Sequence, residues 1–157
     1  MAAPPGASKN RRAREPMPSF DPDPAVVATG PLGQRVHGRS LEQSARLARR
    51  FYEVRTGVWT LVGNGLSNQT FIEGPEGIIA IDTGECVEEM ASALRELRAH
   101  TSTPIVAVCY THFHYIGGTR AVFEDAGRAL PVYGHERIAQ NLARVASEIA
   151  PAYARAV

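Results

Sequence analysis

The spacing of hydrophobic residues changes once along the chain, near Asp82, and this change constrains the fold more than any other sequence feature. Before it, short β-branched and aromatic segments predict strands over residues 58–62, 68–73 and 78–81. Short turns rich in glycine separate these segments, and they predict an antiparallel meander. The continuous apolar run at 78–81 is typical of a strand that is covered on both faces.

Beyond Asp82, helical and strand-like segments alternate. Apolar residues predict helices over 87–97, 119–127 and 135–149, with strands over 104–110 and 130–133 and a helix end at Pro151. Strands followed by this alternation predict an α/β (α+β) fold in which amphipathic helices cover one face of a sheet. The remaining sequence has too few strands to build a second sheet, so we expect the other face to stay uncovered.

Residues 1–45 differ in composition from residues 46–157. Prolines recur there, basic residues cluster between Lys9 and Arg14, and few large apolar side chains are present. Such a segment offsets little of its ordering entropy, so it predicts a tail or a strap that lies on a domain. Residues 40–50 are compatible with a short helix, and residues 46–157 predict one partial domain.

Charge and hydropathy exclude several classes of partner. The formal net charge is +1, which gives no global field that would favour nucleic acid or a membrane surface. No apolar run is long enough to span a bilayer, and the N-terminus lacks the apolar core of a secretory signal. The expected location is therefore the cytoplasm.

Two histidines, His112 and His114, directly follow the predicted strand 104–110 and precede a glycine pair. In an extended segment, residues two apart point to the same side, so both imidazoles could hold one metal ion. Zinc in catalytic sites keeps a position open for water and lowers the pKa of that water. Two histidines need at least one further protein ligand. The alternative interpretation is a pair that only hydrogen-bonds the loop backbone.

Several segments together resemble the opening of the metallo-β-lactamase superfamily: Gly57–Trp59, Asn68–Gly74, Gly77–Gly84 and Tyr110–His114. Within that superfamily, the sequence from Trp59 to Glu85 is similar to the alkyl sulfatase branch, as is the stretch from Tyr133 to Arg155. The resemblance covers about residues 45–157. It implies the N-terminal half of a metallo-β-lactamase-type αβ/βα sandwich.

The resemblance implies a zinc-dependent hydrolase, with one or two zinc ions, that cleaves sulfate esters of alcohols. His112 and His114 match the ligands of the first metal, and Asp82 matches an aspartate that braces the metal loop by hydrogen bonds. The superfamily motif continues with an aspartate and a histidine that hold the second metal. Here Tyr115–Gly118 follows instead, which is two positions shorter and lacks both ligands.

Other candidates for the substrate side of the site are Tyr115, Asn68 and His135, and no catalytic residue is assigned. Tyr115 could equally serve packing, and His135 could equally be a surface or capping histidine. The expected partners are a small-molecule ester substrate and, through the uncovered sheet faces, a second copy of the chain. Two alternatives to an enzyme stay open: a non-catalytic binding or interaction module, and an inactive fragment of a longer enzyme.

Overall fold

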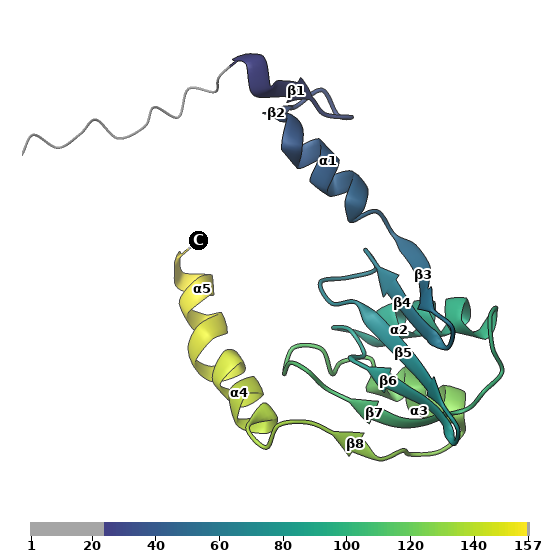
Figure 1. The fold of residues 1–157 in the computed structure, drawn as a ribbon. Helices are drawn as coiled ribbons and strands as arrows, with labels where there is room; N and C mark the ends of the chain where they lie inside the picture. The colour runs from purple at the N-terminus through teal and green to yellow at the C-terminus, as the bar shows by residue number, and fades with distance from the viewer. Residues whose placement is uncertain (1–23, 157) are drawn as a thin grey trace, which may run out of the picture. The chain divides into compact units, whose positions relative to one another are not determined.

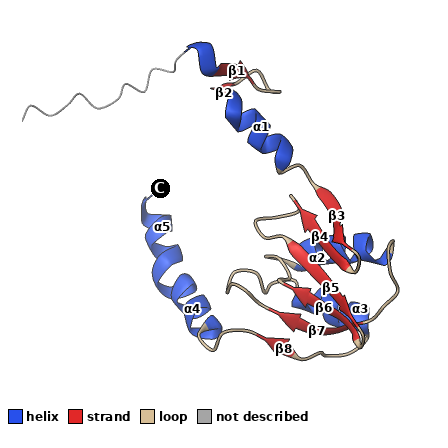
Figure 2. Ribbon diagram, in the orientation of Figure 1, coloured by secondary structure: helices blue, strands red, loops and turns tan. Residues whose placement is uncertain are grey.

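The computed structural model describes residues 24–156, which divide into two units, one ending at Arg46 and one beginning at Leu47. Figure 1 shows the path of the chain, and Figure 2 shows its helices and strands. Both helices and a mixed sheet are present, so the predicted α/β class is confirmed. None of the described helices combines the length and the apolar character needed to cross a membrane.

The first unit has more local structure than the sequence predicted. A 3-10 turn, Pro24–Val26, leads into the antiparallel strands β1 (Val27–Thr29) and β2 (Arg35–His37), which helix α1 (Gly38–Arg46) follows. From residue 24 on, the segment predicted as a tail or strap therefore carries regular local structure, and its earlier part lies outside the described residues. Local bonds are the reason, because the Gly30 amide donates to the Gln34 carbonyl and closes the hairpin at 2.7 Å.

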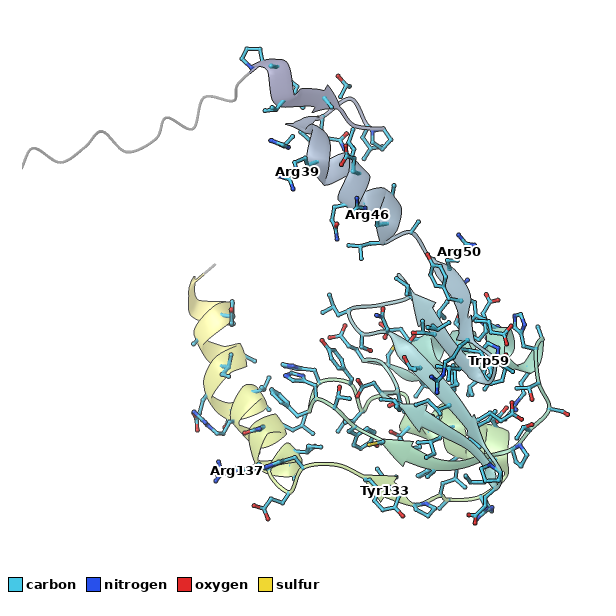
Figure 3. The ribbon with its side chains drawn as sticks, viewed as in Figure 1. Arg39, Arg46, Arg50, Trp59, Tyr133 and Arg137 are labelled. Atoms are coloured by element: carbon cyan, nitrogen blue, oxygen red, sulfur yellow. The ribbon has the colours of Figure 1, made fainter. Side chains whose placement is uncertain are left out.

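The second unit is built on a sheet in which strand order follows chain order. Its strands are β3 (Arg50–Arg55), β4 (Val58–Val62), β5 (Gln69–Gly74), β6 (Gly77–Ile81), β7 (Ile105–Cys109) and β8 (Val132–Tyr133). Strands β3 to β6 pair antiparallel, as the meander prediction required, whereas β6, β7 and β8 pair in parallel. Tyr133, on the edge strand β8, is largely exposed (Figure 3).

Helices α2 (Val87–Arg98) and α3 (Thr119–Ala126) follow β6 and β7 and lie on the same side of the sheet (Figure 1). Between them and the sheet lies the core, which includes Trp59, Leu61, Phe71, Ile78, Met90, Leu97, Val108 and Val122. The other face of the sheet is more open: Ile72 is 38% exposed and its cross-strand neighbour Ile79 is 42% exposed. The second unit thus has one sheet with a helical layer on one face, as the sequence predicted.

After β8 the chain turns into a continuous helical segment: α4 (Ile138–Arg144), a π-helical turn (Val145–Ile149) and α5 (Ala150–Ala156). The prediction that Pro151 ends the helix is wrong. Proline lacks a donor hydrogen but is tolerated within the first turn of a helix. Pro151 is the second residue of α5, directly after the π-helical turn changes the hydrogen-bonding pattern, so the helical path continues through it.

Candidate functional site

The two predicted metal ligands lie on an irregular loop between β7 and α3, residues 111–118, which we call the His loop. The imidazole rings of His112 and His114 are exposed and stacked, with centroids 4.7 Å apart. Their Nδ1 atoms face each other at 3.1 Å. The structure therefore brings together the two side chains that the sequence pattern paired.

Asp82 connects the end of β6 to the first residue of the His loop. Its backbone has φ 56°, a left-handed conformation that aspartate tolerates better than most residues, and its side chain is buried. One carboxylate oxygen accepts the Thr111 amide at 2.8 Å, and the other accepts the Thr111 hydroxyl at 2.5 Å. Asp82 thus fixes the residue that precedes His112, at the position where the resemblance implies a bracing aspartate.

The turn that follows Asp82 packs against the second half of the His loop. The Thr83 amide donates to the Tyr115 carbonyl at 2.9 Å, and the Gly117 amide donates to the Gly84 carbonyl at 3.0 Å. A Cβ atom at Gly117 would lie 2.0 Å from the Glu85 carbonyl oxygen. A Cβ atom at Gly118 would lie 2.0 Å from the carbonyl oxygen of Thr83. The glycine pair is therefore required by this close backbone approach.

A buried polar network joins the segment around the start of β5 to helix α2, and the sequence analysis did not find it. Gln69 is fully buried, its Nε2 donates to the Ser67 carbonyl at 3.0 Å, and its Oε1 accepts from Asn64 at 3.1 Å. The Asn64 side chain also donates to the Glu89 carbonyl on α2. The sequence signal for this network was Gln69, an amide side chain at a strand position that faces the core. Asn68, the residue predicted for the substrate side, is exposed beside this network.

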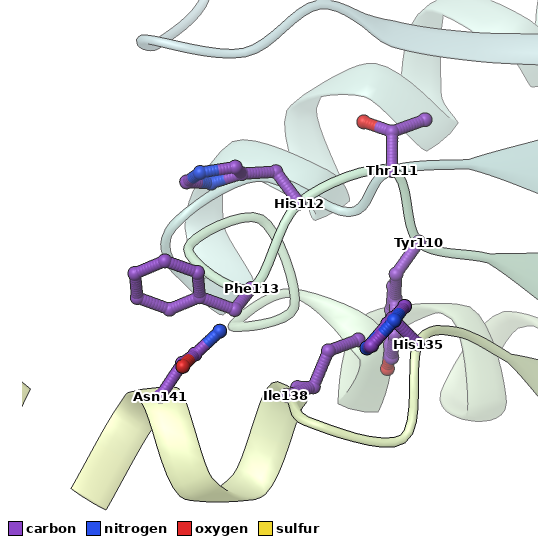
Figure 4. Close-up of a pocket in the computed structure, with 7 residues that line it drawn as sticks. All are labelled: Tyr110, Thr111, His112, Phe113, His135, Ile138 and Asn141. Atoms are coloured by element: carbon purple, nitrogen blue, oxygen red, sulfur yellow. The ribbon is translucent and has the colours of Figure 1, made fainter. Parts of the chain in front are cut away.

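A pocket of about 330 Å³ lies between the His loop and α4 (Figure 4). Its lining residues are Tyr110, Thr111, His112, Phe113, His135, Ile138 and Asn141. Apolar and polar side chains face the same space, so the pocket suits a small amphiphilic molecule. Of the predicted site residues, His112 and His135 meet here, whereas Asp82, His114, Tyr115 and Asn68 do not line it.

His135 also has a local role. Its Nδ1 accepts the Arg137 amide at 3.1 Å, directly before α4 begins. This bond satisfies one backbone donor near a helix N-terminus, as the capping interpretation expected. Tyr115 supplies its carbonyl rather than its side chain to the contact with Thr83, and its ring lies 5.1 Å from that of His112.

The distance between the two histidine nitrogens suits a metal ion, but two ligand side chains are too few to hold one. A zinc–nitrogen distance of about 2.0–2.1 Å places two nitrogens of a tetrahedral site about 3.3 Å apart. The observed Nδ1–Nδ1 distance of 3.1 Å is close to that value. Within residues 24–156, however, no group of three or more His, Cys, Asp or Glu side chains is placed to hold a metal. His112 and His114 thus form a partial donor set that needs further ligands.

Comparisons with known proteins give relatives for part of the chain, although no protein-family model matches it. A linear primary-alkylsulfatase from Pseudomonas sp. is 38% identical over 85 residues, which are 51% of this chain and 16% of that protein. An (R)-specific secondary-alkylsulfatase from Pseudomonas sp. is 36% identical over 78 residues, which are 48% of this chain and 12% of that protein. The chain therefore spans less than a fifth of either relative.

The comparison with a solved alkyl sulfatase structure agrees with the sequence relatives. A double mutant of the sec-alkyl sulfatase PisA1 is 30% identical, with a TM-score of 0.52 over 59% of this chain and 16% of that one. A metallo-β-lactamase from Hirschia baltica is 20% identical, with a TM-score of 0.49 over 59% of this chain and 46% of that one. The predicted resemblance to alkyl sulfatases is thereby confirmed, and the partial coverage fits a likeness to their N-terminal part.

Proposed function

We propose that residues 47–157 carry the first metal-ligand loop of a zinc-dependent hydrolase that cleaves sulfate esters. One observation carries the proposal: the His112–His114 pair, with Nδ1 atoms 3.1 Å apart, lies on a loop that Asp82 braces and that borders a pocket. The sequence likeness to alkylsulfatases supports the choice of sulfate esters among the substrates of hydrolases.

In this proposal, His112 and His114 hold one zinc ion, and at least one further protein ligand and water complete its coordination. Zinc, when bound, lowers the pKa of a coordinated water and polarises the ester. Asp82 holds the loop through Thr111, which orients the His112 ligand. The pocket separates the two parts of an alkyl sulfate: Phe113 and Ile138 offer apolar surface to an alkyl chain, and polar groups beside them suit the ester.

Metal content tests this proposal. Elemental mass spectrometry of the purified chain is expected to find about one zinc per chain, lost in the His112→Ala/His114→Ala double variant. A His37→Ala/His100→Ala double variant is the matched control, because it removes two exposed histidines outside the His loop and should keep the zinc. Release of inorganic sulfate from a medium-chain alkyl sulfate is then measured on the three proteins. Equal zinc in both double variants, or none in the parent chain, would contradict the proposal.

A non-catalytic binding module is the second candidate, and the incomplete donor set favours it. Such a module would use the mixed lining of the pocket without chemistry. Calorimetric titration of an alkyl sulfate into the chelator-treated chain separates the two candidates. Binding that Asn141→Ala weakens, with no sulfate release in the presence of zinc, would favour the module over the hydrolase.

A further inference from the structure

Three hydroxyl groups from separate segments meet where the His loop begins and ends. Tyr110 directly follows β7, Thr119 is the first residue of α3, and Thr83 follows Asp82. The Tyr110 hydroxyl is in hydrogen-bond contact with Thr119 Oγ1, which lies 3.2 Å from Thr83 Oγ1. We call these three side chains the hydroxyl cluster.

Both threonines of the cluster also contact backbone carbonyls of the His loop. Thr119 Oγ1 donates to the Ile116 carbonyl at 2.8 Å, and Thr83 Oγ1 donates to the Tyr115 carbonyl at 3.2 Å. A carbonyl oxygen only accepts, so each of these two contacts uses the single hydroxyl hydrogen of its threonine. When the Thr119 hydrogen lies on the Ile116 carbonyl, the Tyr110 hydroxyl is the donor to Thr119.

The cluster therefore holds the carbonyls of two consecutive residues, Tyr115 and Ile116, which directly follow His114. Near the histidines the loop is also held by bonds of its own: the Tyr115 amide donates to the His112 carbonyl at 3.2 Å, and the His114 amide donates to His112 Nδ1 at 3.3 Å. Thr83 is fully buried, and Tyr110 and Thr119 are half-buried. Water competes weakly for such groups, so these bonds restrain the loop more than exposed ones would.

We propose that Tyr110 is a positioning residue for the His112–His114 pair. Its hydroxyl, acting through Thr119, holds the His loop in the shape that brings the two Nδ1 atoms to 3.1 Å. The inference rests on the proposed function only in its assumption that His112 and His114 bind a metal ion. The loop shape itself can be tested without metal.

The test compares variants that differ by one hydroxyl group. Tyr110→Phe and Thr119→Val remove a hydroxyl at nearly constant shape, and Thr119→Ser retains it. Tyr133→Phe is the matched control, because Tyr133 is 61% exposed on the edge strand β8. Two quantities are measured on the full chain: the ring-nitrogen NMR signals of His112 and His114 without metal, and the zinc Kd by competition with a chelator.

Tyr110→Phe and Thr119→Val should change both ring signals and raise the zinc Kd about 10-fold or more, the range found when a group that orients a metal ligand is lost. Thr119→Ser should restore both quantities, and Tyr133→Phe should leave them unchanged. A Tyr110→Phe chain with a lower Tm but unchanged ring signals and Kd would overturn the inference. If the parent chain binds no zinc, the proposed function fails, while the metal-free ring signals still decide the positioning role.

Discussion

At the scale of single residues, Asp82 combines a left-handed backbone with two accepted hydrogen bonds from Thr111. Asp82→Asn should keep the backbone, because asparagine also tolerates this conformation, but its amide nitrogen cannot accept from Thr111. We expect a loss of about 1–3 kcal/mol in the free energy of unfolding, measured by urea denaturation. Thr111→Val in the same background gives the coupling between the two residues, and an Asn variant as stable as the parent would refute the bracing contact.

The glycine pair of the His loop gives a second prediction. Gly118→Ala should lower the free energy of unfolding by about 1–3 kcal/mol or more, because overpacking forces the backbone to shift. The added methyl would meet the Thr83 carbonyl at 2.0 Å. Gly74→Ala is the control, since a Cβ atom there would lie 3.7 Å from the Gly77 carbonyl oxygen, an ordinary contact distance. Thermal unfolding of both variants checks this, and equal shifts would contradict it.

Some of these residues could be predicted from the sequence and others could not. The pairing of His112 with His114 depends on two positions in one short segment, so local spacing was sufficient. The contact between Gly117 and Glu85 joins segments far apart in the chain, and no local pattern encodes it. The same holds for His135, which reaches the pocket only because β8 pairs with β7.

At the scale of elements, helix α2 begins without a side-chain cap at Cys86. The pKa of Glu88, in its first turn, is lowered, first because its carboxylate accepts its own backbone amide and second because of the Cys86 side chain. A lowered carboxyl pKa stabilises the fold above the ordinary pKa of the group, and this contribution is lost as the pH falls through the lowered value.

Glu88→Gln should therefore reduce the Tm of the chain at neutral pH, and the difference from the parent should vanish in acid. The effect should be small because Glu88 is exposed. Glu76→Gln, in the turn between β5 and β6, is the matched control. Thermal unfolding across the acidic range measures both variants, and a Tm difference that persists at the lowest pH would count against the charge as its cause.

Elements with a strong local pattern were predicted well. The strand at Val58–Val62 has the predicted bounds, and the helix predicted over 87–97 extends by one residue. Strand β3 was missed, because charged residues alternate with its aromatic ones and only pairing with β4 makes it a strand. The helical path through Pro151 was missed for a similar reason, since a π-helical turn has no clear sequence pattern.

At the scale of the whole molecule, the open face of the sheet is the surface most prone to association between chains. Exposed apolar side chains on neighbouring strands favour association of chains. We expect a dimer whose fraction grows with protein concentration, and Ile79→Lys should shift it toward the monomer, because Ile79 is 42% exposed. Sedimentation velocity over a range of concentrations measures this. Leu66→Lys, in the loop between β4 and β5, is the control for added charge, because Leu66 is 79% exposed and lies outside the strands; equal effects of the two lysines would argue against the open face.

Strand β6 pairs antiparallel with β5 and parallel with β7, and this difference affects the order of folding. Its partner β5 is joined to it by a tight turn, whereas its partner β7 arrives only after the whole of α2. Pairs that are close in sequence form faster, because less loop-closure entropy opposes them. The meander should thus assemble early and the His loop late. Substitutions in the loop should speed unfolding and leave the refolding rate nearly unchanged.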